Sequence, residues 1–228
     1  MLMRLSADST HNPNGTIDII QNHLAEMIFS FGKTEGLPFT YQQTRELLFG
    51  DKADAMTWRE ITTILNLRDA FDFLFDNWHY PVELGTVFDY NARVGGHDLE
   101  PNAGYARENY KVIISGVDYV PDDIYAAEEK RLIDEALDVY ADPIELAIYY
   151  CLTISKRQFC CNGNKRTGLM ICNHVLSYYD MGFAFAPIYY AKDAPVFDSS
   201  YIDLLKDFYE EVIDINQAID LAKAFLLS

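Results

Sequence analysis

Apolar residues recur at helical spacing through most of this sequence, and the breaks between these stretches divide the chain into successive helices. The first stretch stops near Gly32 and comprises Ile17, Ile20, Leu24, Met27, Ile28 and Phe31. Two capping-box patterns then predict helix starts, Thr40 with Gln43 and Thr57 with Glu60. The helix expected after Thr57 has an apolar stripe of Ile61, Ile64, Leu65, Phe71, Leu74, Phe75 and Trp78. This pattern predicts a mainly helical chain.

The second half of the chain continues the helical pattern with one interruption. Leu84 to Arg93 and residues 122–140 predict two more helices, and Tyr201 to Tyr209 and Ile215 to Leu227 predict the last two. Residues 110–120 differ, because two β-prone runs flank a glycine turn and predict a hairpin, the only convincing β signal. We expect residues 182–195 to be a connector. The prediction is a flexible tail at residues 1–15 and a single domain at 16–228.

A polar, glycine-bearing segment, residues 156–168, lies between two strongly apolar stretches and is called the central segment below. Asp142 and Pro143 are a typical N-cap and first helical residue, so the helix-loop-helix unit spans residues 142–181. Unpaired N–H groups and the positive end of the helix dipole meet where its second helix starts. Lys165 and Arg166 add two cations there. The segment predicts a phosphate-binding loop, and the alternative is a polar helix start with solvated cations.

Composition narrows the class of protein. The 228 residues carry a formal net charge of −17, and half of them are hydrophobic. A globular chain this acidic is repelled by nucleic acid and by anionic membrane surfaces, so we expect neither as a partner. The four cysteines lie in the central helix-loop-helix without metal-ligand spacing, which argues against a zinc site and favours free thiols in the cytoplasm.

Residues 158–169 resemble the active-site motif of the Fic/Doc family, H-P-F-x-D/E-G-N-G/K-R-x-x-R. The match is carried by Gly163-Asn164-Lys165-Arg166-Thr167 in the Doc-like form. Residues 31–48, 90–96 and 103–121 resemble the family's inhibitory region, the helix end before its flap, and the flap itself. The resemblance implies a Fic-like helical bundle with one β-hairpin flap. In that flap Val112, Ile113, Ile114 and Gly116 would align a segment of a target protein.

Most active members of this family transfer AMP from ATP to a Ser, Thr or Tyr hydroxyl of a target protein, whereas Doc-like members phosphorylate and a few transfer other phosphate-linked groups. Their motif supplies a His base, an acidic Mg²⁺ ligand and a phosphate-binding turn. The resemblance implies that ATP contacts Asn162, Gly163, Asn164, Lys165 and Arg166. It also places Glu35 at the position of the inhibitory glutamate. A helix-end surface charge or a partner of Arg166 is the equal alternative for Glu35.

The sequence departs from the motif at the positions that perform the chemistry. Gln158 replaces the His, and a neutral amide cannot act as a general base, so we favour a structural role for Gln158. Asn162 replaces the acidic residue and would hold Mg²⁺ weakly. Leu169 occupies the position of the second Arg. His174 follows on the next helix as a conceivable base, although a packed or surface role fits it better.

Three functions stay open on the sequence alone. The first is an adenylyltransferase-like protein of low or altered activity, with ATP as substrate or ligand at residues 163–166. The second is a non-enzymatic nucleotide-binding regulator or protein-interaction module, that is, a pseudoenzyme. The third is a Doc-like phosphotransferase. The sequence identifies no target protein and leaves homo-oligomerisation open.

Overall fold

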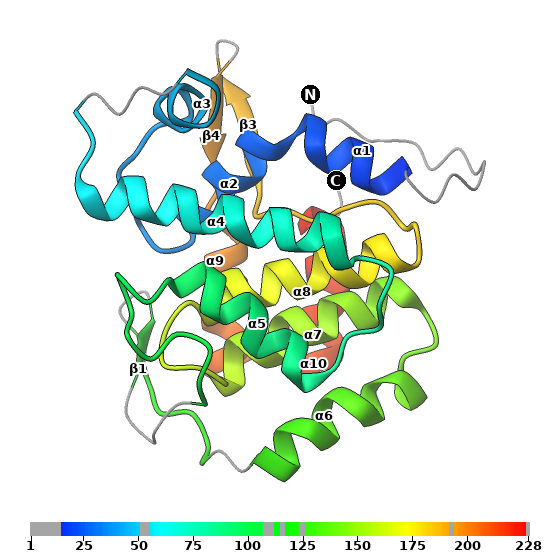
Figure 1. Cartoon of the computed structure of the whole chain (residues 1–228). Helices are drawn as coiled ribbons and strands as arrows, with labels where there is room; N and C mark the ends of the chain where they lie inside the picture. The colour runs from blue at the N-terminus through cyan, green and yellow to red at the C-terminus, as the bar shows by residue number, and fades with distance from the viewer. Residues whose placement is uncertain are drawn as a thin grey trace.

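The computed structural model describes residues 15–50, 55–106, 112–114, 117–123, 126–191 and 194–226. Within these residues the chain forms ten helices and two two-stranded antiparallel sheets (Figure 1). The helices are α1 (Gly15–Asn22), α2 (Leu24–Lys33), α3 (Tyr41–Gly50), α4 (Trp58–Asn77), α5 (Leu84–Gly95), α6 (Ala126–Val139), α7 (Pro143–Arg157), α8 (Asn164–Tyr178), α9 (Ser200–Tyr209) and α10 (Ile215–Leu226). The strands are β1 (Val112–Ile114), β2 (Val117–Tyr119), β3 (Ile188–Ala191) and β4 (Ala194–Phe197).

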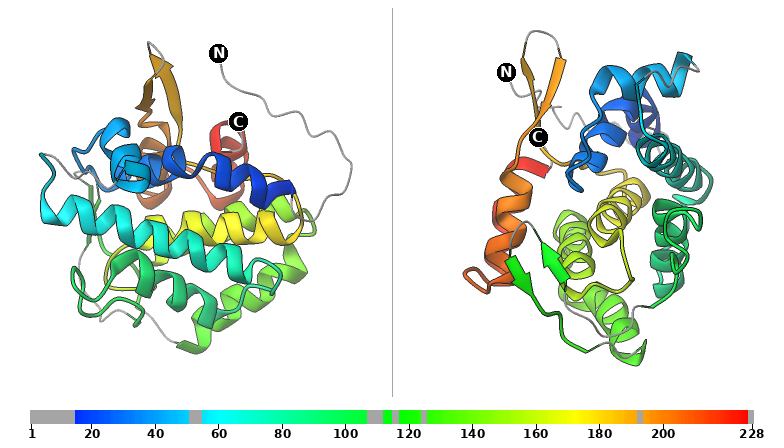
Figure 2. Two further views of the ribbon diagram at one scale, coloured as in Figure 1. Left: turned by 45° about the horizontal axis from the view of Figure 1, so that its top comes forward. Right: turned by 90° about the vertical axis from the view of Figure 1, so that its left-hand side faces the viewer.

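Helices α7 and α8 lie side by side in the middle of the molecule. Figure 2 shows α4 and α5 on one side of this pair and α9 and α10 on the other. Every residue of α8 from Arg166 to Ser177 is buried. Because the helix is enclosed on all sides, its polar residues Asn173 and His174 are hydrogen-bonded inside the protein: Asn173 donates to the Leu169 and Ala184 carbonyls, and His174 bonds the Tyr90 hydroxyl. The central segment is therefore held at both ends by the core.

The predicted helix starts are confirmed, because each is closed by local hydrogen bonds that the sequence encodes. The Thr40 N–H donates to Gln43 Oε1 over 2.8 Å, and the Gln43 N–H donates to Thr40 Oγ1 over 3.2 Å. Thr57 and Glu60 form the same reciprocal pair at α4. At α7 the Asp142 carboxylate accepts from the Ile144 N–H over 2.9 Å. These side chains satisfy backbone donors that a helix start leaves free.

The structure departs from the prediction at three elements. The first expected helix is divided at His23 into α1 and α2. Leu65, which was assigned to the buried stripe of α4, is 43% exposed, while Leu67 and Ala70 are buried. Gly15 begins α1, and the rest of the expected tail lies outside the described residues.

The prediction of a connector at residues 182–195 was wrong, because this region contributes a second hairpin. Strands β3 and β4 pair antiparallel in a register that sets Tyr190 opposite Pro195. The sequence does not predict these strands because both are short and because Pro195 lies within the second one, where a proline argues against a strand. The hairpin extends from the body of the molecule, and β4 contacts α2 (Figure 1).

The predicted hairpin at residues 110–120 is present as β1 and β2. Val112 pairs with Tyr119, Ile113 with Asp118 and Ile114 with Val117. The turn between them, which includes Gly116, lies outside the described residues. Tyr119 stacks on Tyr209 of α9, with ring centroids 5.0 Å apart and planes inclined by 16°. This contact fixes the base of the hairpin to the helical body.

None of the described helices combines the length and the apolar character needed to cross a bilayer.

Candidate functional site

The central segment folds around the side chain of Asn164, the first residue of α8. Its Nδ2 donates to the Cys160 carbonyl over 2.7 Å, and its Oδ1 accepts from the Cys160 N–H over 2.9 Å. Cys160 itself forms a β-bridge with Ala106. Asn164 is almost fully buried. The amide therefore shapes the loop from inside, where a bound phosphate would not meet it.

Gln158 ends α7 in the left-handed region, with φ of 53°. Its side-chain Nε2 donates to the Ser155 carbonyl over 2.5 Å, and its Oε1 accepts from Asn164 Nδ2 over 3.0 Å. The residue is 6% exposed. Both ends of the amide are engaged within the protein, so the geometry directs Gln158 into the fold rather than toward a substrate hydroxyl.

Gly163 is the N-cap of α8, in the left-handed region with φ of 75°. A Cβ at this position would lie 3.2 Å from Val94 Cγ1, so glycine suits both the backbone angle and the close packing. It offers no side chain to cap the helix. Since no N-cap side chain satisfies the N–H groups in the first turn of α8, these donors are suited to a ligand.

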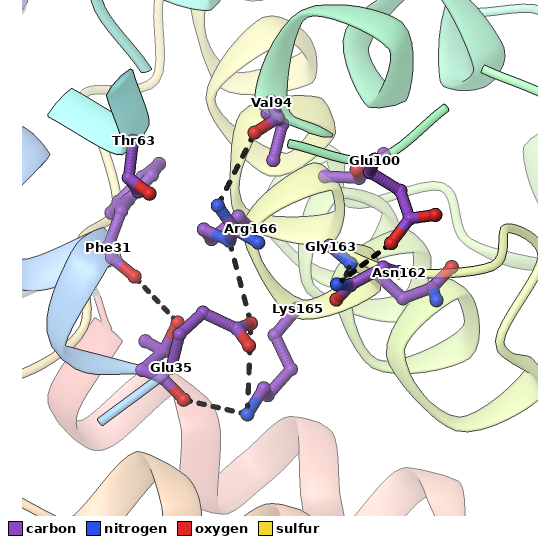
Figure 3. Close-up of polar contacts among 12 residues, drawn as sticks. Phe31, Glu35, Thr63, Val94, Glu100, Asn162, Gly163, Lys165 and Arg166 are labelled. Atoms are coloured by element: carbon purple, nitrogen blue, oxygen red, sulfur yellow. Dashed lines mark hydrogen bonds and ion pairs between the residues drawn. The ribbon is translucent and has the colours of Figure 1, made fainter. Parts of the chain in front are cut away.

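Lys165 and Arg166 converge on Glu35, as Figure 3 shows. Glu35 Oε1 lies 3.5 Å from Arg166 Nε and 3.8 Å from Lys165 Nζ. Lys165 Nζ also donates to the Thr34 carbonyl over 2.7 Å, and Arg166 donates to the Val94 carbonyl over 3.3 Å. The two cationic side chains are 14% and 8% exposed. They are therefore two enclosed cations that share one carboxylate.

The turn after α2 carries Glu35 to this position. The Glu35 N–H donates to the Gly32 carbonyl over 3.1 Å. A Cβ on Gly32 would lie 2.1 Å from the Phe39 ring, so the absence of a side chain lets that buried ring pack under the turn. Close packing of this kind fixes the carboxylate in front of α8.

Glu35 is held in its charged form. Burial, the largest single effect, favours the neutral acid and raises its pKa, but the charges of Arg166 and Lys165 outweigh burial and hold the pKa below its ordinary value. The carboxylate is therefore ionised at neutral pH. An anion already lies against the two cations where the sequence predicted a phosphate.

Asn162 lies beside a carboxylate. Its Oδ1 accepts from the Gly163 N–H over 2.6 Å, and its Nδ2 lies 3.4 Å from Glu100 Oε2. Among the described residues, no group of three His, Cys, Asp or Glu side chains could hold a metal ion. Mg²⁺ in nucleotide sites commonly takes only one or two carboxylates together with the phosphates. The residues present fit such a site only if Glu100 is counted with Asn162.

Asn91 of α5 connects three parts of the site and was not singled out from the sequence. Its Nδ2 donates to the Asn162 carbonyl over 2.7 Å and to Thr167 Oγ1 over 3.0 Å, and its Oδ1 accepts from the Gly104 N–H over 2.9 Å. It is fully buried. A lone Asn within a helical pattern carries no signal of such long-range bonds.

His174 lies within the core. Its Nδ1 lies 2.8 Å from the Tyr90 hydroxyl, and its Nε2 lies 2.8 Å from the Tyr80 carbonyl. Burial lowers the pKa of the imidazole. A neutral ring accepts from Tyr90 and donates to Tyr80. This residue therefore serves packing and is not available as a base.

None of the four cysteines, all of which lie among the described residues, forms a disulfide bond. Cys151, Cys160 and Cys172 are buried, and burial raises the pKa of each, that of Cys151 to about 12. Thiols with a raised pKa are poor nucleophiles at neutral pH. They fill space in the core.

Comparison with known proteins identifies the architecture. No family model matches the sequence, and no curated protein does. Amino acids 134–508 of Fic-1 from C. elegans match the structure with a TM-score of 0.72 at 15% identity, and a variant of that protein gives 0.73 at 16%. These matches cover 96% of this chain, which spans 64% of theirs.

A third solved structure is similar in size to this chain. It is a Fic-domain-containing signalling protein from Bacteroides thetaiotaomicron, with a TM-score of 0.69 and 16% identity, covering 95% of this chain and 93% of its own. The chain therefore has the Fic fold, a helical bundle that carries the β1–β2 hairpin, as the sequence predicted.

Proposed function

We propose that this chain binds the phosphates of a nucleotide such as ATP at the start of α8 and is an AMP transferase of low or altered activity. One observation carries the proposal: in a Fic fold, two enclosed cations behind a glycine N-cap share a single carboxylate. Phosphate oxygens are negatively charged, as the Glu35 carboxylate is, and they provide more acceptors for these cations and for the first-turn N–H groups.

Glu35 then competes with the nucleotide. A phosphate that reaches Arg166 must share the guanidinium with the carboxylate or displace it, because Glu35 Oε1 already lies 3.5 Å from its Nε. This supports the inhibitory role that the resemblance implies for Glu35. It predicts that removing the carboxylate tightens nucleotide binding.

The internal bonds of Gln158 support low activity. Loss of a general base costs about two to four orders of magnitude in rate. The same bonds favour a second candidate, a nucleotide-binding regulator without transferase activity, because an amide that shapes the loop has no free end to orient a hydroxyl. Doc-like phosphorylation is the third candidate. Leu169, which is buried, occupies the position of the second arginine, so that position supplies no cation to the site.

Titration calorimetry with ATP tests the binding site. Lys165→Ala and Arg166→Ala should each weaken binding at least about tenfold, since each removes a charge-assisted contact. Glu35→Ala should tighten it. Lys156→Ala is the matched control, because Lys156 binds the Phe208 carbonyl and Glu211 instead. Binding that is indifferent to Lys165 and Arg166 contradicts the proposal.

Radiolabelled ATP separates the candidate reactions on self and on lysate proteins. Label transferred from the α-phosphate alone identifies AMP transfer, and label from the γ-phosphate identifies phosphorylation. Nucleotide binding without any transfer identifies the regulator. The double variant Gln158→His, Asn162→Asp should raise AMP transfer if the remainder of the site is competent.

A further inference from the structure

Glu100 brings a carboxylate to the central segment from a distant part of the chain. It lies in the turn after α5, is partly buried, and directs Oε2 toward Asn162 at 3.4 Å (Figure 3). This distance exceeds the usual range for a hydrogen bond, so the contact with the Asn162 amide satisfies the carboxylate poorly.

The turn that carries Glu100 is held in place by its own packing. The Glu100 N–H donates to the Gly96 carbonyl over 2.8 Å, and the Glu100 carbonyl accepts from the Ala103 N–H over 2.9 Å. A Cβ on Gly95 would lie 2.6 Å from the Ala103 Cβ, so the glycine allows the turn to close against the end of α5. These contacts fix the backbone from which the Glu100 side chain extends toward Asn162.

Two further contacts fasten this turn to the central segment. Asn91 holds both the Gly104 N–H and the Asn162 carbonyl, and Ala106 forms the β-bridge with Cys160. The backbone that carries Glu100 is therefore joined to the central segment at two places. An ordered backbone lowers the conformational entropy that Glu100 would lose on binding a ligand.

The negative charge of Glu100 disfavours the binding of a metal-free nucleotide at this loop. Lys165 and Arg166 would attract the phosphates of the nucleotide, whereas a carboxylate beside the same loop repels those phosphates. Arg166 is 7% exposed, and its Nε is already paired with Glu35 over 3.5 Å, so Glu100 adds a second negative charge beside the loop. A divalent cation held by Glu100 together with the phosphates would turn this repulsion into attraction.

We propose that Glu100 is the carboxylate ligand for a divalent cation bound together with the nucleotide, in place of the acidic side chain absent at Asn162. The inference rests on the proposed nucleotide site. Mg²⁺ keeps several waters and needs only one or two protein carboxylates when phosphates supply other oxygens. Glu100 supplies charge that the neutral oxygen of Asn162 does not.

The test measures ATP affinity with Mg²⁺ and with EDTA, for the full chain and Glu100→Gln. Glu100→Gln should weaken Mg²⁺–ATP about tenfold and strengthen metal-free ATP about threefold, since one charge acts with opposite sign on the two ligands. Asp98→Asn is the control: it removes the same charge from an exposed residue two positions earlier and should change neither affinity. The signal of Mn²⁺ in electron paramagnetic resonance reports the metal directly. Glu100→Gln should lose the bound-Mn²⁺ fraction seen with ATP.

A rescue experiment separates metal binding from a structural role. Asn162→Asp in the Glu100→Gln background should restore the preference for Mg²⁺–ATP, which simple loosening of the turn would not allow. If Glu100→Gln changes both affinities in the same direction, or neither, the inference is overturned while the nucleotide site stands. If neither form of ATP binds, even to Glu35→Ala, the proposed function fails and the inference fails with it.

Discussion

Replacement of Glu35 by glutamine tests how the two cations of α8 are stabilised in the absence of a ligand. The substitution keeps the size of the side chain and removes its charge. Glu35 is 21% exposed, and its Oε1 lies 3.5 Å from Arg166 and 3.8 Å from Lys165. Glutamine leaves two enclosed cations without a counter-charge, so the free energy of unfolding should fall.

The distances and the burial set the magnitude. Unit charges 4 Å apart near a protein surface attract by about 4 kcal/mol at an effective dielectric constant of about 20. Transferring the carboxylate from water cancels part of that attraction, and remaining exposure screens more, so we expect a net loss of about 2 kcal/mol. In a domain of this size that loss lowers the melting temperature by roughly 4–8 °C.

The loss should depend on pH in a defined direction. The folded-state pKa of Glu35 is depressed, so its contribution is complete above the unfolded value of about 4.3 and is lost as pH falls through the folded value. Urea unfolding should therefore show a constant gap between wild type and Glu35→Gln from pH 8 to 6. The gap should narrow below about pH 4.3.

A surface ion pair of similar length provides the control. Glu211 lies 3.4 Å from Lys156 but is 81% exposed, so Glu211→Gln should cost less than about 0.5 kcal/mol. Equal losses for the two variants, or a Glu35→Gln gap that persists unchanged at low pH, would refute the electrostatic account. The same Glu35 substitution should tighten ATP binding, so stability and affinity should move in opposite directions.

Three further substitutions probe the frame of the site. Gly163→Ala should cost about 1–2 kcal/mol in thermal unfolding because of its positive φ, whereas Gly85→Ala, with open space around its Cβ, should be neutral or stabilising. Asn91→Ala should cost about 2–4 kcal/mol through three lost buried bonds, and the absence of a measurable loss would remove its structural role. His174 has a folded pKa below its unfolded one, so wild type should lose stability as pH falls below about 6.5, and His174→Gln should lose less over that interval in urea unfolding.

Local signals accounted for most of the helical framework. Side chains within three residues of one another form the capping pairs at Thr40 and Thr57 and the N-cap at Asp142. These helix starts can therefore be predicted from the sequence alone. The second hairpin was missed because strands need a partner across the turn, and Pro195 hides that pairing in the sequence. Leu65 shows the limit of periodicity, since the buried side of α4 is fixed by what packs on it.

The sequence by itself determined a helix-loop-helix with a glycine N-cap followed by two cations, and with Gln158 and Asn162 where a base and an acid would be expected. These features depend on neighbouring residues, and neighbours along the chain are visible without a fold. Only the tertiary structure decided what each group contacts: Glu35 against Lys165 and Arg166, and Glu100 against Asn162. The physical reason is that packing of separate helices, rather than local geometry, sets which charges share a low-dielectric space.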